Sequence, residues 1–132
     1  MVSQNKEDYL RAFYILEERE KVINVTNISS YLKISKPSVS QMIKILSKDK
    51  FLNYIKYGEL KLTKKGKDFS RKLTIKHRII ETFLRDILKL NLKEIHNEAD
   101  KLEHAMSDET VFKLKKLLRN PGCDPHGKKI PS

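Results

Sequence analysis

The chain has 132 residues, of which 39% are hydrophobic and 34% are charged, with a formal net charge of +11. This size allows one domain, or one domain with an extension. The low content of turn-forming residues, four glycines and four prolines, argues against a β fold with many turns. The excess of positive charge favours an anionic partner, either nucleic acid or an acidic membrane surface.

The N-terminal part of the sequence predicts three helices, the last two joined by a short turn. Apolar residues recur at helical spacing from Asn5 to Glu20. Either Asn24 or Thr26 can cap a short second helix. Ser35 is the expected N-cap of the third helix, and Pro37 lies in its first turn, where proline is tolerated. Two helices connected in this way are typical of a helix-turn-helix.

Residues 51–63 are expected to form a β-hairpin. Two short apolar runs flank the sequence Tyr57-Gly58-Glu59, which suits a tight turn. A hairpin that directly follows the second helix of a helix-turn-helix is a wing. The N-terminal part of the chain therefore predicts a winged helix-turn-helix with a two-stranded wing.

This region contains eight candidate DNA contacts. Residues at the start of the second helix of a helix-turn-helix enter the major groove, where Gln41 can bind adenine with two hydrogen bonds and Ser38 can donate adaptably. The lysines suit phosphates, whose contacts set register rather than sequence. The alternative is that the lysines form only a solvated face and Ser35 is only a cap. The candidates are Ser35, Lys36, Pro37, Ser38, Gln41, Lys44, Lys56 and Lys61.

Helical periodicity returns from Lys64 to Leu90, and further helices are expected at about residues 91–106 and after Ser107, a suitable N-cap. Residues 1–90 carry 20 Lys and Arg against 10 Asp and Glu, whereas residues 94–109 carry six acidic residues and one lysine. One part of the chain can therefore attract a polyanion, and another can attract cations.

The helix expected at residues 91–106 carries a stripe of imidazoles and carboxylates beside an apolar face. At roughly 100° per residue, the four residues of this stripe share one arc. His77 and Glu81 are four residues apart on the preceding helix, a spacing that can place two donor atoms on one ion. Asp8 could add an oxygen from the first helix. The stripe consists of His96, Asp100, Glu103 and His104.

These residues also have structural interpretations. His77 and Glu81 could only stabilise their helix, by ~0.2–0.5 kcal/mol, and Asp8 could only respond to the helix dipole. His96 and His104 could be ordinary surface histidines. We favour a divalent transition metal because three of the four histidines have a carboxylate at helical spacing. Nitrogen and oxygen donors without a thiolate suit Mn²⁺ or Fe²⁺ best, and Zn²⁺ or Co²⁺ could bind in vitro.

The location of the protein is indicated by its cysteine content and its hydropathy. A single cysteine, Cys123, excludes an intrachain disulfide and fits a reducing compartment. No stretch approaches the ~20 apolar residues of a membrane-spanning helix, and the N-terminus has no apolar signal core. We expect a soluble cytoplasmic protein with no membrane partner.

Together these motifs resemble the diphtheria-toxin-repressor and manganese-transport-regulator family of metal-dependent transcription factors. The resemblance runs from about Glu7 to Pro131 and rests on EDYLRAFYILEE, SKPSVSQMIKIL, YGELKLTKKGK, KHRIIETFLRDIL, IHNEADKLEHAMSDE and DPHGKKIP. It implies a repressor of Mn²⁺ or Fe²⁺ uptake genes that binds palindromic operator DNA as a metal-activated homodimer.

The resemblance also implies a mainly α fold in three parts. We expect the winged helix-turn-helix at residues 1–63, a helical dimerisation and metal-binding domain at residues 64–120, and an extended tail at residues 121–132. Many relatives continue into a small SH3-like domain, which this sequence does not include because it stops at Ser132; it is either a natural short form or a shortened piece of a longer protein.

The family's metal ligands map unevenly onto this chain. Glu103 and His104 match its EH metal pair, and Asp100 stands where relatives have Cys or Glu. Asp8 matches the manganese-type members. Arg11 replaces a ligand glutamate of the manganese regulator, so a two-ion cluster of that type would lack one carboxylate.

A second, ancillary site of the iron-type members is also matched. Its residues here are His77, Glu81 and His96. His77 can instead join Asp8 in the manganese-type arrangement. In some relatives a CPHG motif gives a Cys and a His to a second site; here Asp124 and His126 occupy those places as weaker candidates, and Cys123 comes one residue too early.

The sequence therefore predicts a metal sensor that controls transcription. A metal between Asp8 and the C-terminal ligands would join the DNA-binding half of the chain to the dimerisation half. In a dimer it would hold the two DNA-reading helices about 34–36 Å apart, which is the spacing of successive major grooves. The main alternative is a winged-helix regulator not controlled by metal. A metalloenzyme with Glu103 as general base lacks HExxH spacing and a Gly-rich phosphate loop, so neither catalysis nor a small-molecule substrate is expected. A metal-buffering or protein-interaction domain is the remaining alternative.

Overall fold

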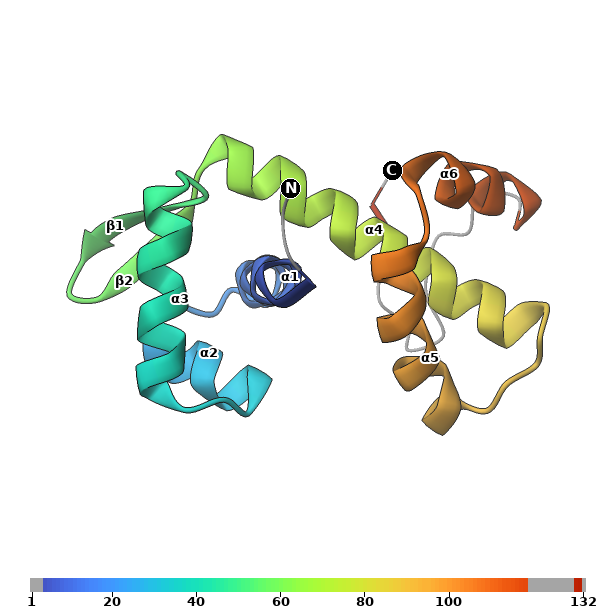
Figure 1. The fold of residues 1–132 in the computed structure, drawn as a ribbon, viewed down its shortest axis with the longest axis horizontal. Coiled ribbons are helices and arrows are strands. Elements are labelled where there is room, and N and C mark those ends of the chain that lie inside the picture. Colours follow the sequence, from blue (N-terminus) through green and yellow to red (C-terminus); the bar gives the residue numbers. More distant parts are fainter. Residues whose placement is uncertain (1–3, 119–129, 132) are drawn as a thin grey trace. The chain divides into compact units, whose positions relative to one another are not determined.

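The computed structural model describes residues 4–118 and 130–131, and its elements follow the predicted order. The chain divides into two compact units, the first ending at Arg71 and the second beginning at Lys72. The elements are α1 (Gln4–Glu18), α2 (Val25–Leu32), α3 (Lys36–Lys48), β1 (Leu52–Lys56), β2 (Glu59–Leu62), α4 (Lys64–Asp86), α5 (Leu92–Ala105) and α6 (Asp108–Leu117) (Figure 1). The expected mainly α fold with a two-stranded wing is confirmed. Within the described residues, no helix is long and apolar enough to cross a membrane.

Side-chain caps mark where several of the helices begin, α2 and α6 among them. Of the two candidates for α2, Asn24 is the N-cap, and its side-chain oxygen accepts a hydrogen bond of 2.7 Å from the Asn27 backbone N–H. Ser107 caps α6 in the same way. Ser35 occupies the N-cap position of α3, but its hydroxyl donates to the Ser38 hydroxyl instead of capping the helix. The start of α3 therefore depends on Pro37, whose fixed φ favours the first helical turn.

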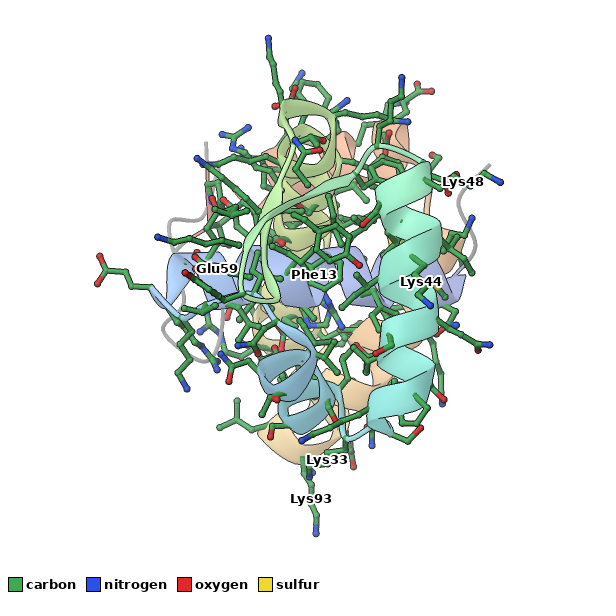
Figure 2. The ribbon with its side chains drawn as sticks, turned by 90° about the vertical axis from the view of Figure 1, so that its left-hand side faces the viewer. Phe13, Lys33, Lys44, Lys48, Glu59 and Lys93 are labelled. Atoms are coloured by element: carbon green, nitrogen blue, oxygen red, sulfur yellow. The ribbon has the colours of Figure 1, made fainter. Side chains whose placement is uncertain are left out.

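The first unit encloses a core formed mainly by its helices. The side chains at its centre are at most 1% exposed; they include Leu10, Phe13, Ile28, Ile43 and Leu46. In α3 the buried residues are spaced three or four apart, so one face of the helix packs and the opposite face remains in solvent. Figure 2 shows Lys44 and Lys48 along α3 on the outer side of this unit.

The hairpin that follows α3 is closed by a tight turn. Tyr57 and Gly58 both have positive φ, 49° and 75°, as a two-residue type I′ turn requires. Leu52 lies opposite Leu62 at the base of the hairpin, and both are buried. The base of the wing is therefore attached to the core, while β1 is exposed from Asn53 onward.

The entry to α4 is tightly packed against the wing. The backbone N–H of Gly66 donates to the Thr63 hydroxyl, which caps the helix. A Cβ at Gly66 would clash with the backbone carbonyl of Phe51, so only glycine fits there without a backbone shift.

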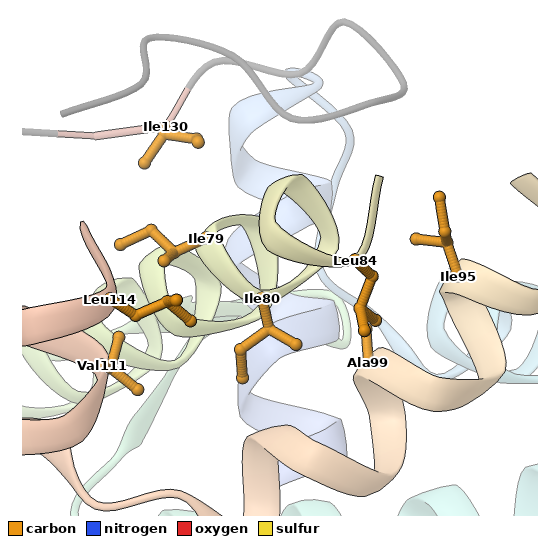
Figure 3. Packing of buried hydrophobic residues seen from close by; sticks show 8 residues of the cluster. All are labelled: Ile79, Ile80, Leu84, Ile95, Ala99, Val111, Leu114 and Ile130. Atoms are coloured by element: carbon orange, nitrogen blue, oxygen red, sulfur yellow. The ribbon is translucent and has the colours of Figure 1, made fainter. Parts of the chain in front are cut away.

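The second unit has its own core between α4, α5 and α6 (Figure 3). Its buried members are Ile79, Ile80, Leu84, Ile95, Ala99, Val111, Leu114 and Ile130. Ile130 is only 5% exposed, so the described end of the chain belongs to this core. Most of the predicted extended tail, including Asp124 and His126, lies outside the described residues.

The two isoleucines of α3 allow a matched test of the first core. Ile43 is 1% exposed and Ile45 is 43% exposed. We expect Ile43→Ala to lower the free energy of unfolding by about 2–5 kcal/mol, because it removes packed methylenes and leaves a cavity. Ile45→Ala should cost less than about 1 kcal/mol. Urea denaturation followed by circular dichroism measures both, and equal losses would contradict the assigned face of α3.

Candidate functional site

His77 on α4 lies between two carboxylates in the second unit. Its Nδ1 is 2.8 Å from Oε2 of Glu103 on α5, and its Nε2 is 3.1 Å from Oε1 of Glu81, one turn further along α4. Both carboxylates are only 2% exposed, and His77 is 7% exposed. The predicted pair of His77 and Glu81 is therefore part of a larger, buried polar cluster.

The donor chemistry of this cluster fits a bound cation. A neutral imidazole carries one N–H donor, yet both nitrogens of His77 face carboxylate oxygens. One of these contacts therefore needs either a second ring proton or a cation. Buried carboxylates such as Glu81 and Glu103 also require compensating positive charge, because leaving them charged and uncompensated away from water is costly.

The potential ligands form two overlapping groups within the second unit. In each group, the three ligand atoms lie within 4.8 Å of one another. We name them metal group A, consisting of His77, Glu81 and His96, and metal group B, consisting of His77, Asp100 and Glu103. Nitrogen and oxygen donors without a thiolate suit Mn²⁺ and Fe²⁺.

Three further contacts involve the predicted stripe of α5. Nε2 of His96 is 3.7 Å from Oδ2 of Asp100, and the His96 ring lies edge-on to the His77 ring at 5.8 Å. Nε2 of His104 is 3.3 Å from Oε1 of Glu103. The structure thus brings together six of the predicted metal ligands, and their assignment as ligands stays a prediction.

The remaining predicted ligands are placed differently. Asp8 lies half-buried on α1, in the first unit, and its role as a ligand also stays a prediction. Asp124 and His126 lie outside the described residues. The contact between His77 and Glu103 was not foreseen, because residues 26 apart leave no periodic signal in the sequence.

The candidate DNA contacts all lie in the first unit, and all eight are exposed. Six of them lie at the N-cap of α3 or along its exposed side, and Lys56 and Lys61 lie on the strands of the wing. Helix α3 has no acidic residue. Lys48, absent from the predicted set, is exposed four residues after Lys44 and extends the same basic side. This surface can approach a polyanion without like-charge repulsion from its own helix.

Comparison with known families gives matches over nearly the whole chain. Residues 1–60 match the iron dependent repressor, N-terminal DNA binding domain, and residues 63–132 match the iron dependent repressor, metal binding and dimerisation domain. The iron-dependent repressor IdeR of Mycobacterium tuberculosis is 37% identical over 125 residues, which cover 95% of this chain and 54% of IdeR. The chain thus spans about half the length of that relative.

Two other relatives are named as regulators. The transcriptional regulator MntR of Bacillus subtilis is 33% identical over 119 residues, 90% of this chain and 83% of MntR. The solved structure of the manganese regulator SloR is similar to this chain with a TM-score of 0.86 and 41% identity, covering 99% of this chain and 61% of SloR.

Two glutamates of α5 provide a matched test of the metal centre. Glu103 is buried in metal group B, whereas Glu98 is half-exposed and faces Lys101. We expect Glu103→Gln to weaken Mn²⁺ binding by at least about tenfold, because it removes a negative ligand. Glu98→Gln makes the same chemical change outside the groups and should leave the affinity unchanged. Isothermal titration calorimetry compares the two, and equal affinities would argue against ligation by Glu103.

Proposed function

Because the chain belongs to the iron-dependent-repressor family of metal-dependent transcriptional regulators, we propose that it represses metal-uptake genes by binding operator DNA when Mn²⁺ or Fe²⁺ is bound. The observation that carries this proposal is the His77 ring, buried between Glu81 and Glu103. The alternative, a winged-helix regulator without metal control, leaves this buried cluster of acids without a purpose.

The first unit supplies the DNA-binding surface. In this proposal residues 1–63 are the DNA-binding domain, and α3 is the recognition helix. Ser38 and Gln41 lie near its N-terminus, the part of a recognition helix that contacts base edges, and both are exposed. The surrounding lysines contact phosphates, which contribute affinity and salt dependence without reading sequence.

The second unit supplies the metal centre. Six of its residues would hold the ion: His77, Glu81, His96, Asp100, Glu103 and His104. When bound, the metal would add positive charge beside the buried carboxylates of these residues. The ligands come from both α4 and α5, so they hold one particular arrangement of these helices. The metal can shift the protein toward the arrangement that binds DNA only if its affinity for that arrangement is higher than its affinity for the others.

A homodimer completes the proposal. A palindromic operator requires two reading heads related by a two-fold axis. The segment that joins α4 to α5 and the first residue of α5 expose three large apolar side chains, Ile87, Leu88 and Leu92, each at least 50% exposed. We place the dimer contact in the helical domain proposed at residues 64–120, which contains this segment. The role we propose is non-catalytic, cytoplasmic and without a small-molecule substrate or a membrane partner.

DNA binding should depend on metal. In fluorescence anisotropy with a pool of the organism's promoter fragments, we expect tight binding to a few fragments with Mn²⁺ or anaerobic Fe²⁺, and loss of that binding with a chelator. A parallel measurement with Zn²⁺ shows how strongly it activates DNA binding compared with Mn²⁺ and Fe²⁺. Equal binding with chelator would leave a DNA-binding protein and contradict metal control.

Base and phosphate contacts should be separable on α3. Gln41→Ala should reduce binding to the selected fragments more than to random DNA, by about 1–3 kcal/mol if it reads a base. Lys44→Ala should weaken both equally and lower the salt slope by about one. Lys101→Ala, an exposed change on α5, is the control. The affinity of all three variants for selected and random DNA is measured as a function of salt concentration. Identical behaviour of the two α3 variants would contradict the assignment of Gln41 to a base and Lys44 to a phosphate.

A further inference from the structure

We infer that His77 couples the two metal groups: its Nε2 is a ligand in metal group A, and its Nδ1–H positions the Glu103 carboxylate of metal group B. The inference rests on the proposed function, since it takes both groups as metal sites. It assigns His77 two different tasks, one for each ring nitrogen.

The two nitrogens of His77 face different ligand sets. On the Nε2 side lies Glu81, at 3.1 Å, which belongs to metal group A together with His96. On the Nδ1 side lie Glu103, at 2.8 Å, and Asp100, at 3.7 Å. A neutral imidazole has a single lone pair in its plane, so it can be a ligand through one nitrogen while the other keeps its proton.

The contact lengths indicate which nitrogen keeps the proton. The 2.8 Å separation of Nδ1 and Glu103 has the length of a charge-assisted hydrogen bond, while Asp100 lies beyond hydrogen-bond distance from the same atom. Nε2 faces the Glu81 carboxylate, and Glu81 and His96 of metal group A offer oxygen and nitrogen donors. Histidine ligands generally donate their other N–H to an oxygen acceptor, which fixes both partners.

Here the acceptor is itself a potential ligand. Glu103 is 2% exposed, and its two oxygens have different neighbours: Oε2 meets His77, and Oε1 lies 3.3 Å from His104. The hydrogen bond from His77 therefore sets the rotation of this carboxylate. The orientation of Glu103 as a ligand in metal group B thus depends on His77, a ligand of metal group A.

Two amide substitutions separate the two tasks. In His77→Asn the amide nitrogen can take the place of Nδ1, so the donor to Glu103 is kept and the group A ligand is lost. In His77→Gln the amide reaches the place of Nε2, so the donor to Glu103 is lost. His96→Gln removes only a ligand of metal group A and is the matched control.

The measurement is Mn²⁺ titration of the full chain, with bound ions counted by calorimetry and by electron paramagnetic resonance. We expect two ions in the unaltered protein. In His77→Asn and His96→Gln one ion should be lost, and affinity at metal group B should stay within about threefold. In His77→Gln that affinity should fall by about 10–100-fold, the usual effect of losing a partner that orients a ligand.

The outcomes distinguish this inference from the proposed function. Equal weakening of metal group B in His77→Asn and His77→Gln would overturn the coupling, as would a single ion in the unaltered chain. Thermal unfolding checks that each variant is folded. If His77→Gln does not fold, retention of metal group B by His77→Asn still supports the inference, and its loss contradicts it. No Mn²⁺, Fe²⁺ or Zn²⁺ binding by the unaltered protein would refute the proposed function itself.

Discussion

The second unit is organised around the burial of negative charge. Glu81 and Glu103 are held away from water on either side of one imidazole, and such an arrangement is stable only when positive charge compensates it. The apolar residues of α4 and α5 lie beside this polar cluster and hold the two helices together. The hydrophobic core therefore does more than stabilise the unit, because it keeps acidic side chains close to one another despite their repulsion.

The two units also differ in how they present charge, and this difference suits a regulated DNA-binding protein. Helix α3 has three lysines and no acidic residue, whereas α5 has four acidic residues. The acids of α5 and α4 would repel a phosphate backbone, and a bound divalent cation would reduce that repulsion. The proposed regulation by metal can thus draw on electrostatics as well as on geometry.

Features that depend on neighbouring residues were predictable from the sequence, and features that depend on distant ones were not. Apolar spacing predicted the six helices, and the Tyr57-Gly58 turn predicted the wing. The end of α4 was misplaced, since the predicted helix continues to Leu90 but the helix ends at Asp86, with Lys89 at a φ of 57° in a position that glycine more often occupies. Helical spacing placed His77 with Glu81, but only tertiary packing could show its contact with Glu103.

Ile130 bears on how the protein is made. Its side chain completes the core that also contains Ile79 and Leu114, so that core closes only after residue 130 has been synthesised. The first unit ends at Arg71, so all its buried residues are synthesised well before Ile130. During translation at about 5–20 residues per second, the first unit can fold seconds before the second unit is complete. A nascent chain would then spend that time with the proposed DNA-binding surface but without the proposed metal centre.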